Sequence, residues 1–372
     1  MNILVLEPYY GGSHKAFLAG LIQHLPYAFD LLTLSAHSWK WRMRLAAPHF
    51  AGVLAADPRD IAKTYDRILC SSLLDAAALR GLLPPHLRGV PILTYFHENQ
   101  FAYPMQVSEA RDVHFGLTNL TTALASDRLA FNSQYNLDSF LAGCKELLAK
   151  MPDMSLAGYE EAIRLKATIL YPGLDFSGID SCQEERQAGR PPVLVWNHRW
   201  EHDKNPELFF NTLYGLADKG VPFGLIVLGE SFRNQPTAFA QAKERLAQHI
   251  VHFGYAEDRQ EYCRLLCRGD VVVSTARHEF YGMAVLEAVR AGCRPLVPDR
   301  LSYRELFAPE FRYHDGEFSK RLLAAIKAGR LATDEAEALT RRFSWPTLTE
   351  SYQRWLAFSG DADDGVCGLP LS

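Results

Sequence analysis

The chain has 372 residues, a formal net charge of −4, and 48% hydrophobic and 22% charged residues. This length suits two domains of about 150–190 residues each, and the composition is that of a soluble globular protein. No apolar run approaches the ~18 residues of a membrane span. The net charge supplies no global basic field, so a nucleic acid could be held only by a local patch.

The start of the chain and its cysteines indicate the compartment. The first residues, MNILVLEPYYGG, have no basic segment and no small-residue cleavage site, so they predict a first core strand and not a signal peptide. The seven cysteines are odd in number and scattered, which indicates reduced thiols and a cytoplasmic protein. Cys263 and Cys267 lie one helical turn apart without a second pair or a histidine cluster, so we expect no metal site.

The first half alternates strands and helices, which predicts a parallel sheet with right-handed crossovers. A helix from about Ser13 to Leu25 follows the first strand, with Ser13 as its N-cap. The turn at Gly11 and Gly12 suits two roles equally: a close approach of the backbone to a donor phosphate, or a plain tight turn. The predicted strands are Asn2–Leu6, Phe29–Leu34, Ile68–Ser71, Pro91–Phe96, Asp127–Asn132 and Ala167–Leu170.

The second half repeats this alternation. Pro172-Gly173-Leu174-Asp175 breaks the first set, and the polar stretch Gln183–Pro192 predicts a crossing between two domains, residues 1–172 and 173–344. We expect an amphipathic helix at about 345–360 to pack back on the first domain. The predicted elements are strands Val193–Trp196, Phe223–Leu228, His249–Phe253 and Val271–Val273, and helices Pro206–Leu216 (N-cap Asn205), Phe239–Leu246 and Gln260–Cys267.

The stretch Gly269–Asp299 predicts a buried strand, a polar turn, a helix that begins after Gly282, and a second strand. A helix N-terminus at the carboxyl end of a strand is an anion site, because it presents N–H groups and the positive end of a dipole. Glu279 lies just before this helix and Glu287 lies within it. A carboxylate accepts hydrogen bonds from paired hydroxyls, so the pair suits a ligand with a phosphate and a sugar.

Two further loops follow strands that should end at the same sheet edge. Arg199 and Lys204 stand five residues apart before a helix, which suits cations that bind a diphosphate, although two solvated cations would give the same pattern. Gly254 and Tyr255 follow another strand, where a flat base could lie against the backbone. Together the three loops predict a nucleotide site.

This combination resembles family 4 of the retaining glycosyltransferases, and it spans essentially the whole chain. The resemblance implies the GT-B fold, in which two Rossmann-like α/β domains face a central cleft. Glu279-Phe280-Tyr281-Gly282 is bulkier than the turn usual in that family. The implied donor ligands are Arg199 and Lys204 for the diphosphate, Glu287 for the ribose, Glu279 for the transferred sugar, and the amides of Phe280, Tyr281, Gly282 and Met283 for sugar and phosphate.

Motifs in the first half resemble one group in particular, the tRNA-queuosine mannosyltransferases. These motifs are Glu7–His14, Ser38–Arg42 and Tyr95–Gln100. The resemblance implies transfer of mannose from GDP-mannose to the cyclopentene-diol of queuosine in the anticodon of tRNA-Asp, without a cofactor. His97 occupies the place of a family histidine that reaches the sugar, and His14, Glu98 and Asn99 become acceptor candidates.

Residues Trp39 to Arg44 alternate aromatic or apolar residues with cations. Aromatics that stack an unpaired base and cations that meet phosphates are what an RNA loop requires. An amphipathic element with core tryptophans and solvent-facing cations fits equally well. The acceptor candidates in this segment are Trp39, Lys40, Trp41, Arg42 and Arg44.

The expected chemistry is departure of a diphosphate from an anomeric carbon. Arg199, Lys204 and the helix dipole would neutralise the leaving charge, so no divalent metal is required. The resemblance implies same-face attack, with Glu279 in a positioning role. Two other classes stay open: a transferase of this fold with a lipid or polysaccharide acceptor, and a non-catalytic module that binds tRNA or a nucleotide.

Overall fold

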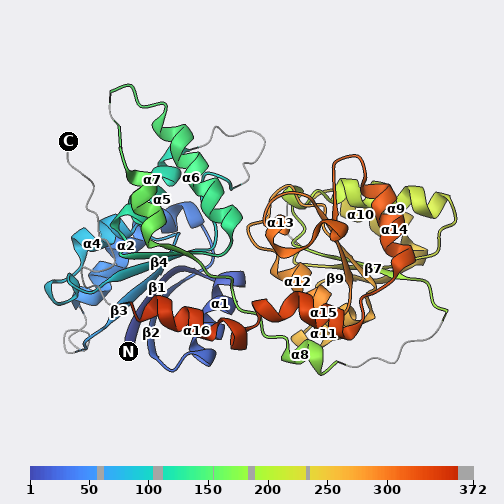
Figure 1. Ribbon diagram of the computed structural model, residues 1–372, viewed down its shortest axis with the longest axis horizontal. Coiled ribbons are helices and arrows are strands. Elements are labelled where there is room, and N and C mark those ends of the chain that lie inside the picture. The colour runs from blue at the N-terminus through green and yellow to red at the C-terminus, as the bar shows by residue number, and fades with distance from the viewer. Residues whose placement is uncertain (57–62, 104–111, 154, 183–188, 232–234, 359–372) are drawn as a thin grey trace. The chain divides into compact units, whose positions relative to one another are not determined.

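The computed structural model describes residues 1–56, 63–103, 112–153, 155–182, 189–231 and 235–358. The chain divides into two compact units (Figure 1), an N-terminal unit of Met1–Gly173 with Trp345–Ser372 and a C-terminal unit of Leu174–Ser344. Of the crossing predicted at 183–192, residues 183–188 lie outside the described part of the chain, as do the last two residues of the helix predicted at about 345–360.

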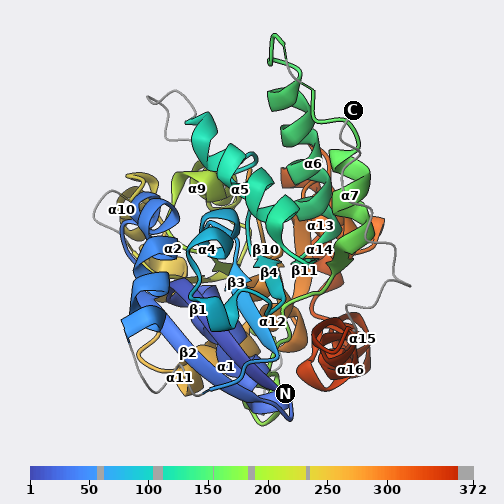
Figure 2. The same cartoon turned by 90° about the vertical axis from the view of Figure 1, so that its left-hand side faces the viewer.

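The N-terminal unit is built on a six-stranded parallel sheet in the order β2-β1-β3-β4-β5-β6. Every strand predicted from the first half is present, and the first extends beyond Leu6 to Tyr10. Figure 2 shows β2, β1, β3 and β4 side by side. The strands are β1 (Asn2–Tyr10), β2 (Ala28–Ser35), β3 (Arg67–Ser71), β4 (Ile92–Phe96), β5 (Arg128–Phe131) and β6 (Ala167–Ile169).

Helices cover both faces of this sheet. Side chains that point to either face are therefore buried, which explains why the strand sequences are nearly continuous apolar runs. One correction concerns the first helix: its N-cap is Gly11, and Ser13 lies inside the helix and does not cap it. The helices are α1 (Gly12–His24), α2 (Trp39–Ala56), α4 (Ala76–Leu82), η1 (Pro85–Leu87), α5 (Val113–Ala125), α6 (Gln134–Leu148), α7 (Tyr159–Lys166) and α16 (Trp345–Leu356).

The C-terminal helix α16 belongs to the N-terminal unit and packs against α1 (Figure 1). Its apolar face is buried in the core beside β1 and β4. Trp345 lies so close to Gly20 that a Cβ there would collide with the indole ring, and the same holds for Gly173. The last helix therefore completes the first core.

The C-terminal unit has a second six-stranded parallel sheet, in the order β12-β11-β10-β7-β8-β9. Its strands are β7 (Val193–Asn197), β8 (Gly224–Leu228), β9 (Ile250–Gly254), β10 (Val271–Val273), β11 (Arg294–Pro298) and β12 (Arg312–Tyr313). The longer helices are α9 (Pro206–Asp218), α10 (Ala238–Arg245), α11 (Arg259–Arg268), α12 (Met283–Arg290), α14 (Phe318–Ala328) and α15 (Thr333–Thr340). Shorter helical segments are α8 (Ser177–Asp180), η2 (His202–Lys204), η3 (Ala247–His249), α13 (Tyr303–Leu306), η4 (Pro309–Phe311) and η5 (Arg341–Phe343).

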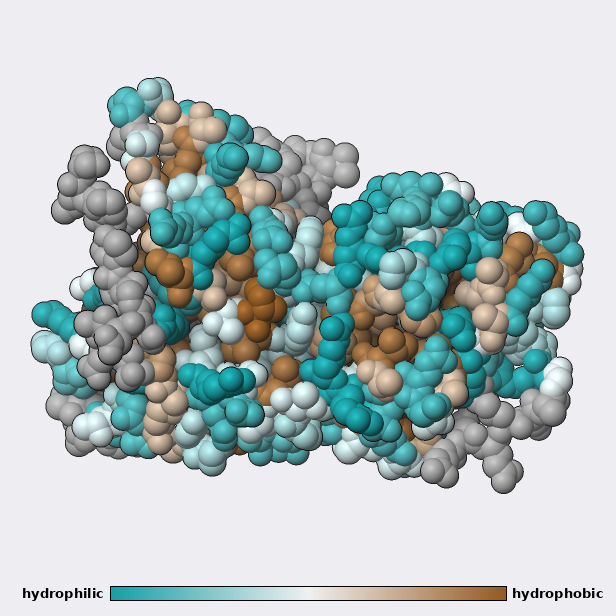
Figure 3. All heavy atoms as spheres, viewed as in Figure 1, coloured by the Kyte–Doolittle hydropathy of each residue, from teal (hydrophilic) through white to brown (hydrophobic). Residues whose placement is uncertain are grey.

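The core of this unit is aromatic, with Trp196, Phe209, Phe210 and Phe239 packed beneath the sheet. Asn205 does precede α9, as predicted, but its side chain makes no capping hydrogen bond and its φ is 53°. Among the described residues, no helix is both long and apolar enough to span a membrane. On the face drawn in Figure 3, apolar side chains lie in groups between hydrophilic ones.

Candidate active site

The loops after β7 and β10 meet at the carboxyl edge of the C-terminal sheet, because these strands are neighbours. The Thr275 hydroxyl donates to the carbonyl oxygen of Lys204 at 2.9 Å. The Arg277 amide donates to the carbonyl oxygen of Asp203 at 2.8 Å. Two of the three loops expected to converge are therefore in direct contact.

Lys204 lies buried at this junction, with 6% of its surface exposed. Its Nζ donates to the carbonyl oxygen of His278 at 2.8 Å, and lies 3.2 Å from Asp203 Oδ2 and 3.3 Å from Glu279 Oε2. Burial by itself lowers the pKa of Lys204, but the charges of Glu279 and Asp203 more than offset this and raise it. The side chain is therefore a fixed, permanently charged ammonium group.

Glu279 is the second member of this cluster, as the sequence predicted. Burial raises the pKa of its carboxyl group, yet the positive charge of Lys204 outweighs burial and brings the pKa to about 2. The two neighbouring histidines have the opposite response: burial and then Lys204 lower the pKa of His198 and of His278 to about 4. At neutral pH the ionised Glu279 and the ammonium group of Lys204 therefore lie beside two neutral imidazoles.

The turn from Phe280 to Met283 leads from Glu279 into α12. Gly282 has a φ of 107°, a conformation that suits glycine. The Ser302 hydroxyl donates to the carbonyl oxygen of Tyr281 at 2.9 Å, which fixes the turn from α13. The side chains of Phe280 and Tyr281 are buried, so only backbone could serve a ligand here.

Glu287 lies inside α12, and both of its carboxylate oxygens have partners. The Tyr262 hydroxyl donates to Oε2 at 2.6 Å, and Arg259 Nη2 lies 2.7 Å from Oε1. Asn197 Nδ2 in turn donates to the Tyr262 hydroxyl at 2.8 Å and to the carbonyl oxygen of Ala284 at 3.1 Å. A chain of hydrogen bonds from β7 through α11 thus orients the predicted ribose-binding carboxylate.

The remaining predicted donor residues are at the surface. Arg199 is exposed and pairs with Glu201 at 3.1 Å, whereas Lys204 from the same loop is buried. The positive charge of Arg199 nevertheless contributes to the pKa of Lys204, so the two cations act on the same region. Gly254 ends β9, and Tyr255 is 73% exposed. The helix that follows them, α11, carries the two side chains that hold Glu287.

A second charged cluster lies in the N-terminal unit, at the carboxyl ends of β1 and β4. His14 Nδ1 is 3.2 Å from Glu7 Oε2, and its Nε2 is 3.4 Å from Glu98 Oε2. The ring of His97 lies against that of His14, with centroids 4.0 Å apart. The Ser71 hydroxyl donates to Glu7 Oε1 at 3.1 Å, which holds the buried carboxylate from β3.

The two histidines of this cluster differ in protonation state at neutral pH: His14 is charged and His97 is neutral. Burial lowers the pKa of His14, but the carboxylates of Glu7 and Glu98 outweigh it and raise the pKa to about 10. Burial and the positive charge of His14 hold the pKa of His97 well below its ordinary value. Glu7, His14 and His97 could offer ligand atoms within 4.8 Å of one another. A protonated imidazole does not ligate a metal, so the ion pairs of His14 compete with such a use.

Other predicted residues of the N-terminal unit serve its own structure. The Asn99 side chain is fully buried, donates to Asn136 Oδ1 at 2.9 Å and accepts from the Ala102 amide at 2.9 Å. Gly11 packs so closely on Ala36 that a Cβ would collide with it, and Gly12 begins α1 with a φ of 49°. Asn99 therefore supports the loop after β4 and is not placed to meet an acceptor.

The segment Trp39–Arg44 forms the first turns of α2, and its members differ in environment. Trp39 packs on Phe115, with ring centroids 5.0 Å apart, while Trp41 is 68% exposed. Arg42 Nη2 donates to the Ser35 carbonyl at 3.3 Å, Arg44 lies 3.7 Å from Asp112, and Lys40 is exposed. Trp39 therefore packs as the amphipathic alternative expects, and contact of Trp41 and Lys40 with RNA stays a prediction.

Several site residues were missed by the sequence reasoning. Asp203, Tyr262, Arg259 and Ser302 each contact a predicted residue but carry no motif of their own. One signal was available for Tyr262: it lies one turn before Leu265 and Leu266, on the buried side of α11, where a polar hydroxyl requires a partner.

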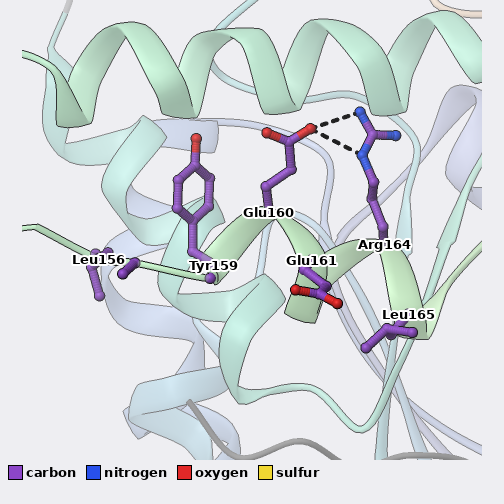
Figure 4. Close-up of a pocket in the computed structure, with 8 residues that line it drawn as sticks. Leu156, Tyr159, Glu160, Glu161, Arg164 and Leu165 are labelled. Atoms are coloured by element: carbon purple, nitrogen blue, oxygen red, sulfur yellow. Dashed lines mark hydrogen bonds and ion pairs between the residues drawn. The ribbon is translucent and has the colours of Figure 1, made fainter. Parts of the chain in front are cut away.

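A shallow hollow lies elsewhere, on α7 of the N-terminal unit (Figure 4). It is lined by Leu156, Tyr159 and Leu165, and by Glu160 and Arg164, which pair at 2.9 Å. Burial raises the pKa of Tyr159 in this hollow.

The two parallel-sheet units and the similarity to known proteins identify a glycosyltransferase of the GT-B fold. A family model described as glycosyl transferases group 1 matches residues 180–328. Anabaena HepE, solved in complex with UDP, superposes with a TM-score of 0.68 at 13% identity, covering 96% of this chain and 100% of that one. Sucrose-phosphate synthase from Thermosynechococcus elongatus also gives 0.68 at 13% identity, covering 95% and 98%.

Sequence similarity identifies the family. A family model described as tRNA-queuosine alpha-mannosyltransferase N-terminal matches residues 2–174. The tRNA-queuosine alpha-mannosyltransferase of Drosophila melanogaster is 36% identical over 353 residues, which cover 92% of each chain. The chain therefore belongs to the tRNA-queuosine alpha-mannosyltransferase family. The GDP-mannose:cellobiosyl-diphosphopolyprenol alpha-mannosyltransferase of Xanthomonas campestris is 24% identical over 216 residues, covering 57% of this chain and 50% of that one.

Proposed function

We propose that the protein transfers mannose from GDP-mannose to the cyclopentene-diol of queuosine in the anticodon of tRNA-Asp, with retention at the anomeric carbon. The observation that carries this proposal is the full-length similarity to the Drosophila enzyme named for mannosyl transfer to tRNA queuosine. The Xanthomonas relative supports the donor, because its name specifies GDP-mannose. We further propose that the reaction takes place in the cytoplasm and needs no cofactor.

In this reaction the bond between the anomeric carbon and the diphosphate oxygen breaks, and a bond to a hydroxyl oxygen of the diol forms on the same face. The hydroxyl proton passes to the departing phosphate. Negative charge develops on the diphosphate as its bond to the anomeric carbon breaks, before the proton arrives, so the groups that stabilise it must be cationic or hydrogen-bond donors. The cations are Lys204 and Arg199, and the hydrogen-bond donors are the amides at the N-terminus of α12.

Glu279 and Glu287 have separate roles in the proposed site. The low pKa of Glu279 keeps it ionised, so it can accept hydrogen bonds from the hydroxyls of mannose and position the sugar. Glu287, oriented by Tyr262 and Arg259, accepts hydrogen bonds from the two ribose hydroxyls. His97 is neutral at physiological pH, so it can exchange hydrogen bonds with the substrate without adding charge.

The test is to incubate the protein with GDP-mannose and tRNA-Asp that contains queuosine, then digest the tRNA and weigh its nucleosides. We expect queuosine to gain one hexose with GDP-mannose and not with UDP-glucose or UDP-galactose. The same tRNA with guanosine in place of queuosine is the control and should gain nothing. Transfer to a polyprenyl diphosphate sugar, with none to tRNA, would overturn the acceptor assignment.

Donor binding is measured separately by calorimetric titration with GDP. Lys204→Ala and Glu287→Ala should weaken binding about tenfold or more, which corresponds to a loss of about 1.4 kcal/mol or more. Lys219→Ala, at an exposed lysine of the same unit, is the matched control and should leave the affinity unchanged. Equal GDP affinity in all three variants would refute the proposed donor site.

A further inference from the structure

The edge of the N-terminal sheet carries an unusual balance of charge. Residues 8–56 contain four lysine and arginine residues and a single acidic residue, Asp30, whereas the whole chain has 39 and 43. Asp30 Oδ2 is neutralised by Lys63 at 2.8 Å. It also lies five residues before the carboxyl end of β2, about 17 Å away along the strand. The carboxyl end of this edge carries the cations Lys15, Lys40, Arg42 and Arg44, of which Arg44 pairs with Asp112.

The loops at this end form one continuous surface. Tyr10 at the end of β1 pairs in register with Ser35 at the end of β2, which is the edge strand. The Nζ of Lys15 lies 5.8 Å from the centre of the Tyr10 ring. Arg42 Nη2 joins α2 to the end of β2 through its bond to Ser35. Figure 2 shows α1, β1, β2 and α2 in this unit.

Trp41 is the large aromatic side chain that this surface exposes to solvent. Tryptophan is usually well buried because its ring is large and mainly apolar, yet Trp41 is 68% exposed in the first turn of α2. Trp39, two residues earlier, packs on Phe115 and anchors the same turn. The helix thus holds one indole ring in the protein and presents another to solvent beside exposed Lys40.

We propose that this surface binds the acceptor RNA, with Trp41 stacked on an unpaired base and Lys15 and Lys40 in contact with phosphates. The proposal rests on the proposed function for the identity of the RNA, a tRNA anticodon loop. Unpaired loop bases stack on aromatic rings, and cations beside them meet the backbone. Arg42 and Arg44 contact Ser35 and Asp112 and are assigned to structure, whereas the Nζ atoms of Lys15 and Lys40 lie 5.8 and 5.9 Å from the ring centres of Tyr10 and Trp39.

A lipid surface is the competing partner, because α2 also exposes Leu45 and Val53. A helix that lies in a membrane needs a continuous apolar face. Here Pro48, His49 and Gly52 occupy the exposed positions between those two residues. The cations are confined to the first two turns of the helix, next to Trp41. Charge and aromatic surface therefore coincide at one end of α2, as a nucleic-acid loop requires.

The experiment measures the affinity of the full chain for a fluorescein-labelled anticodon stem-loop across a series of salt concentrations. We expect Trp41→Ala to weaken binding about 5- to 150-fold, the range for one lost stacking contact of about 1–3 kcal/mol. We expect the double variant K15Q/K40Q to reduce the slope of log K against log[salt] by about 1.4–1.8, since each phosphate contact contributes about 0.7–0.9. Matched controls at exposed positions of the same unit, Lys150→Gln and Leu165→Ala, should bind as the parent protein does.

Two further measurements separate this proposal from the proposed function. GDP affinity should be unchanged in Trp41→Ala, and the KM for tRNA should rise while that for GDP-mannose does not. If mannosyl transfer occurs but Trp41→Ala and K15Q/K40Q bind RNA normally, the surface is refuted and the function stands. If the variants lose RNA binding but no nucleoside is glycosylated, the surface stands and the function fails. Unchanged RNA affinity with lost binding to phosphatidylglycerol vesicles would overturn the proposal in favour of a lipid partner.

Discussion

The Tyr262 hydroxyl is the hydrogen-bond donor to Glu287 Oε2 in the candidate donor site, and no sequence motif marks it. Tyr262→Phe removes this oxygen and keeps the ring that packs in α11. Burial and then the charge of Glu287 hold the pKa of Tyr262 well above its ordinary value, so the hydroxyl is a permanent donor. Its loss leaves Glu287 with Arg259 as the remaining partner described above.

The magnitude follows from the hydrogen bonds lost. A hydrogen bond to a charged group stabilises a protein by about 1.5–3 kcal/mol, and the bond to Glu287 Oε2 is short, at 2.6 Å. Asn197 keeps its bond to the Ala284 carbonyl, so its amide is not left without a partner. We expect Tyr262→Phe to lower the free energy of unfolding by about 1.5–3 kcal/mol. If about 1.4 kcal/mol of this loss is expressed in the orientation of Glu287, the Kd for GDP rises about tenfold.

The matched control is Tyr214→Phe in the same unit. The Tyr214 hydroxyl is buried and makes no hydrogen bond to any described residue, so its removal should cost nothing. Unfolding is followed by differential scanning calorimetry and GDP binding by isothermal titration. If Tyr262→Phe and Tyr214→Phe unfold at the same temperature and bind GDP equally well, the hydrogen-bond chain to Glu287 has no function and the account of the ribose site is wrong.

Two other predictions concern the N-terminal unit. A group whose pKa is raised from 6.5 to about 10 stabilises the fold below pH 6.5 and loses this contribution as the pH rises toward 10. His14→Gln, which leaves Glu7 and Glu98 without their cation, should therefore be less stable than the parent at pH 6, by a margin that shrinks toward pH 10 in urea titrations; a constant margin would contradict the ion-pair account. Trp345→Ala should cost about 3–5 kcal/mol of stability, because it empties a buried site between α1 and α16. Trp41→Ala, at an exposed indole, should change stability by no more than about 0.5 kcal/mol in the same urea unfolding assay, and equal losses would refute the docking of α16.

Much of the fold could be predicted from the sequence, because both sheets are parallel and covered by helices. Such strands are short apolar runs between polar turns, so Val193–Asn197 and Val271–Val273 stood out within a residue or so of their ends. Helix starts were less predictable. Ser13 has the chemistry of an N-cap, but the chain turns two residues earlier, at Gly11, where close packing on Ala36 leaves no room for a Cβ.

The candidate site was also predictable only in part. Lys204 and Glu279 could be placed together because each follows a strand, and the carboxyl ends of neighbouring parallel strands lie at one edge. The partners of Glu287 could not be placed, since Tyr262 and Arg259 reach it from α11 through side-chain directions that no spacing encodes. Trp39 is packed and Trp41 is exposed because of the way α2 is rotated against the sheet. The alternating sequence pattern did not determine that rotation.

The charges around Lys204 explain why a second cation is needed in the donor site. Asp203 and Glu279 outweigh the single ammonium group of Lys204, so the buried cluster carries a net negative charge. A diphosphate placed beside it would be repelled by the two carboxylates as well as attracted by Lys204. The N-terminus of α12 supplies about half a positive charge, which does not offset this balance by itself. Arg199 is exposed on the same loop and pairs with Glu201 at 3.1 Å. It can turn toward an arriving anion, because Glu201 is partly exposed and would not be left as a fully buried, unpaired carboxylate.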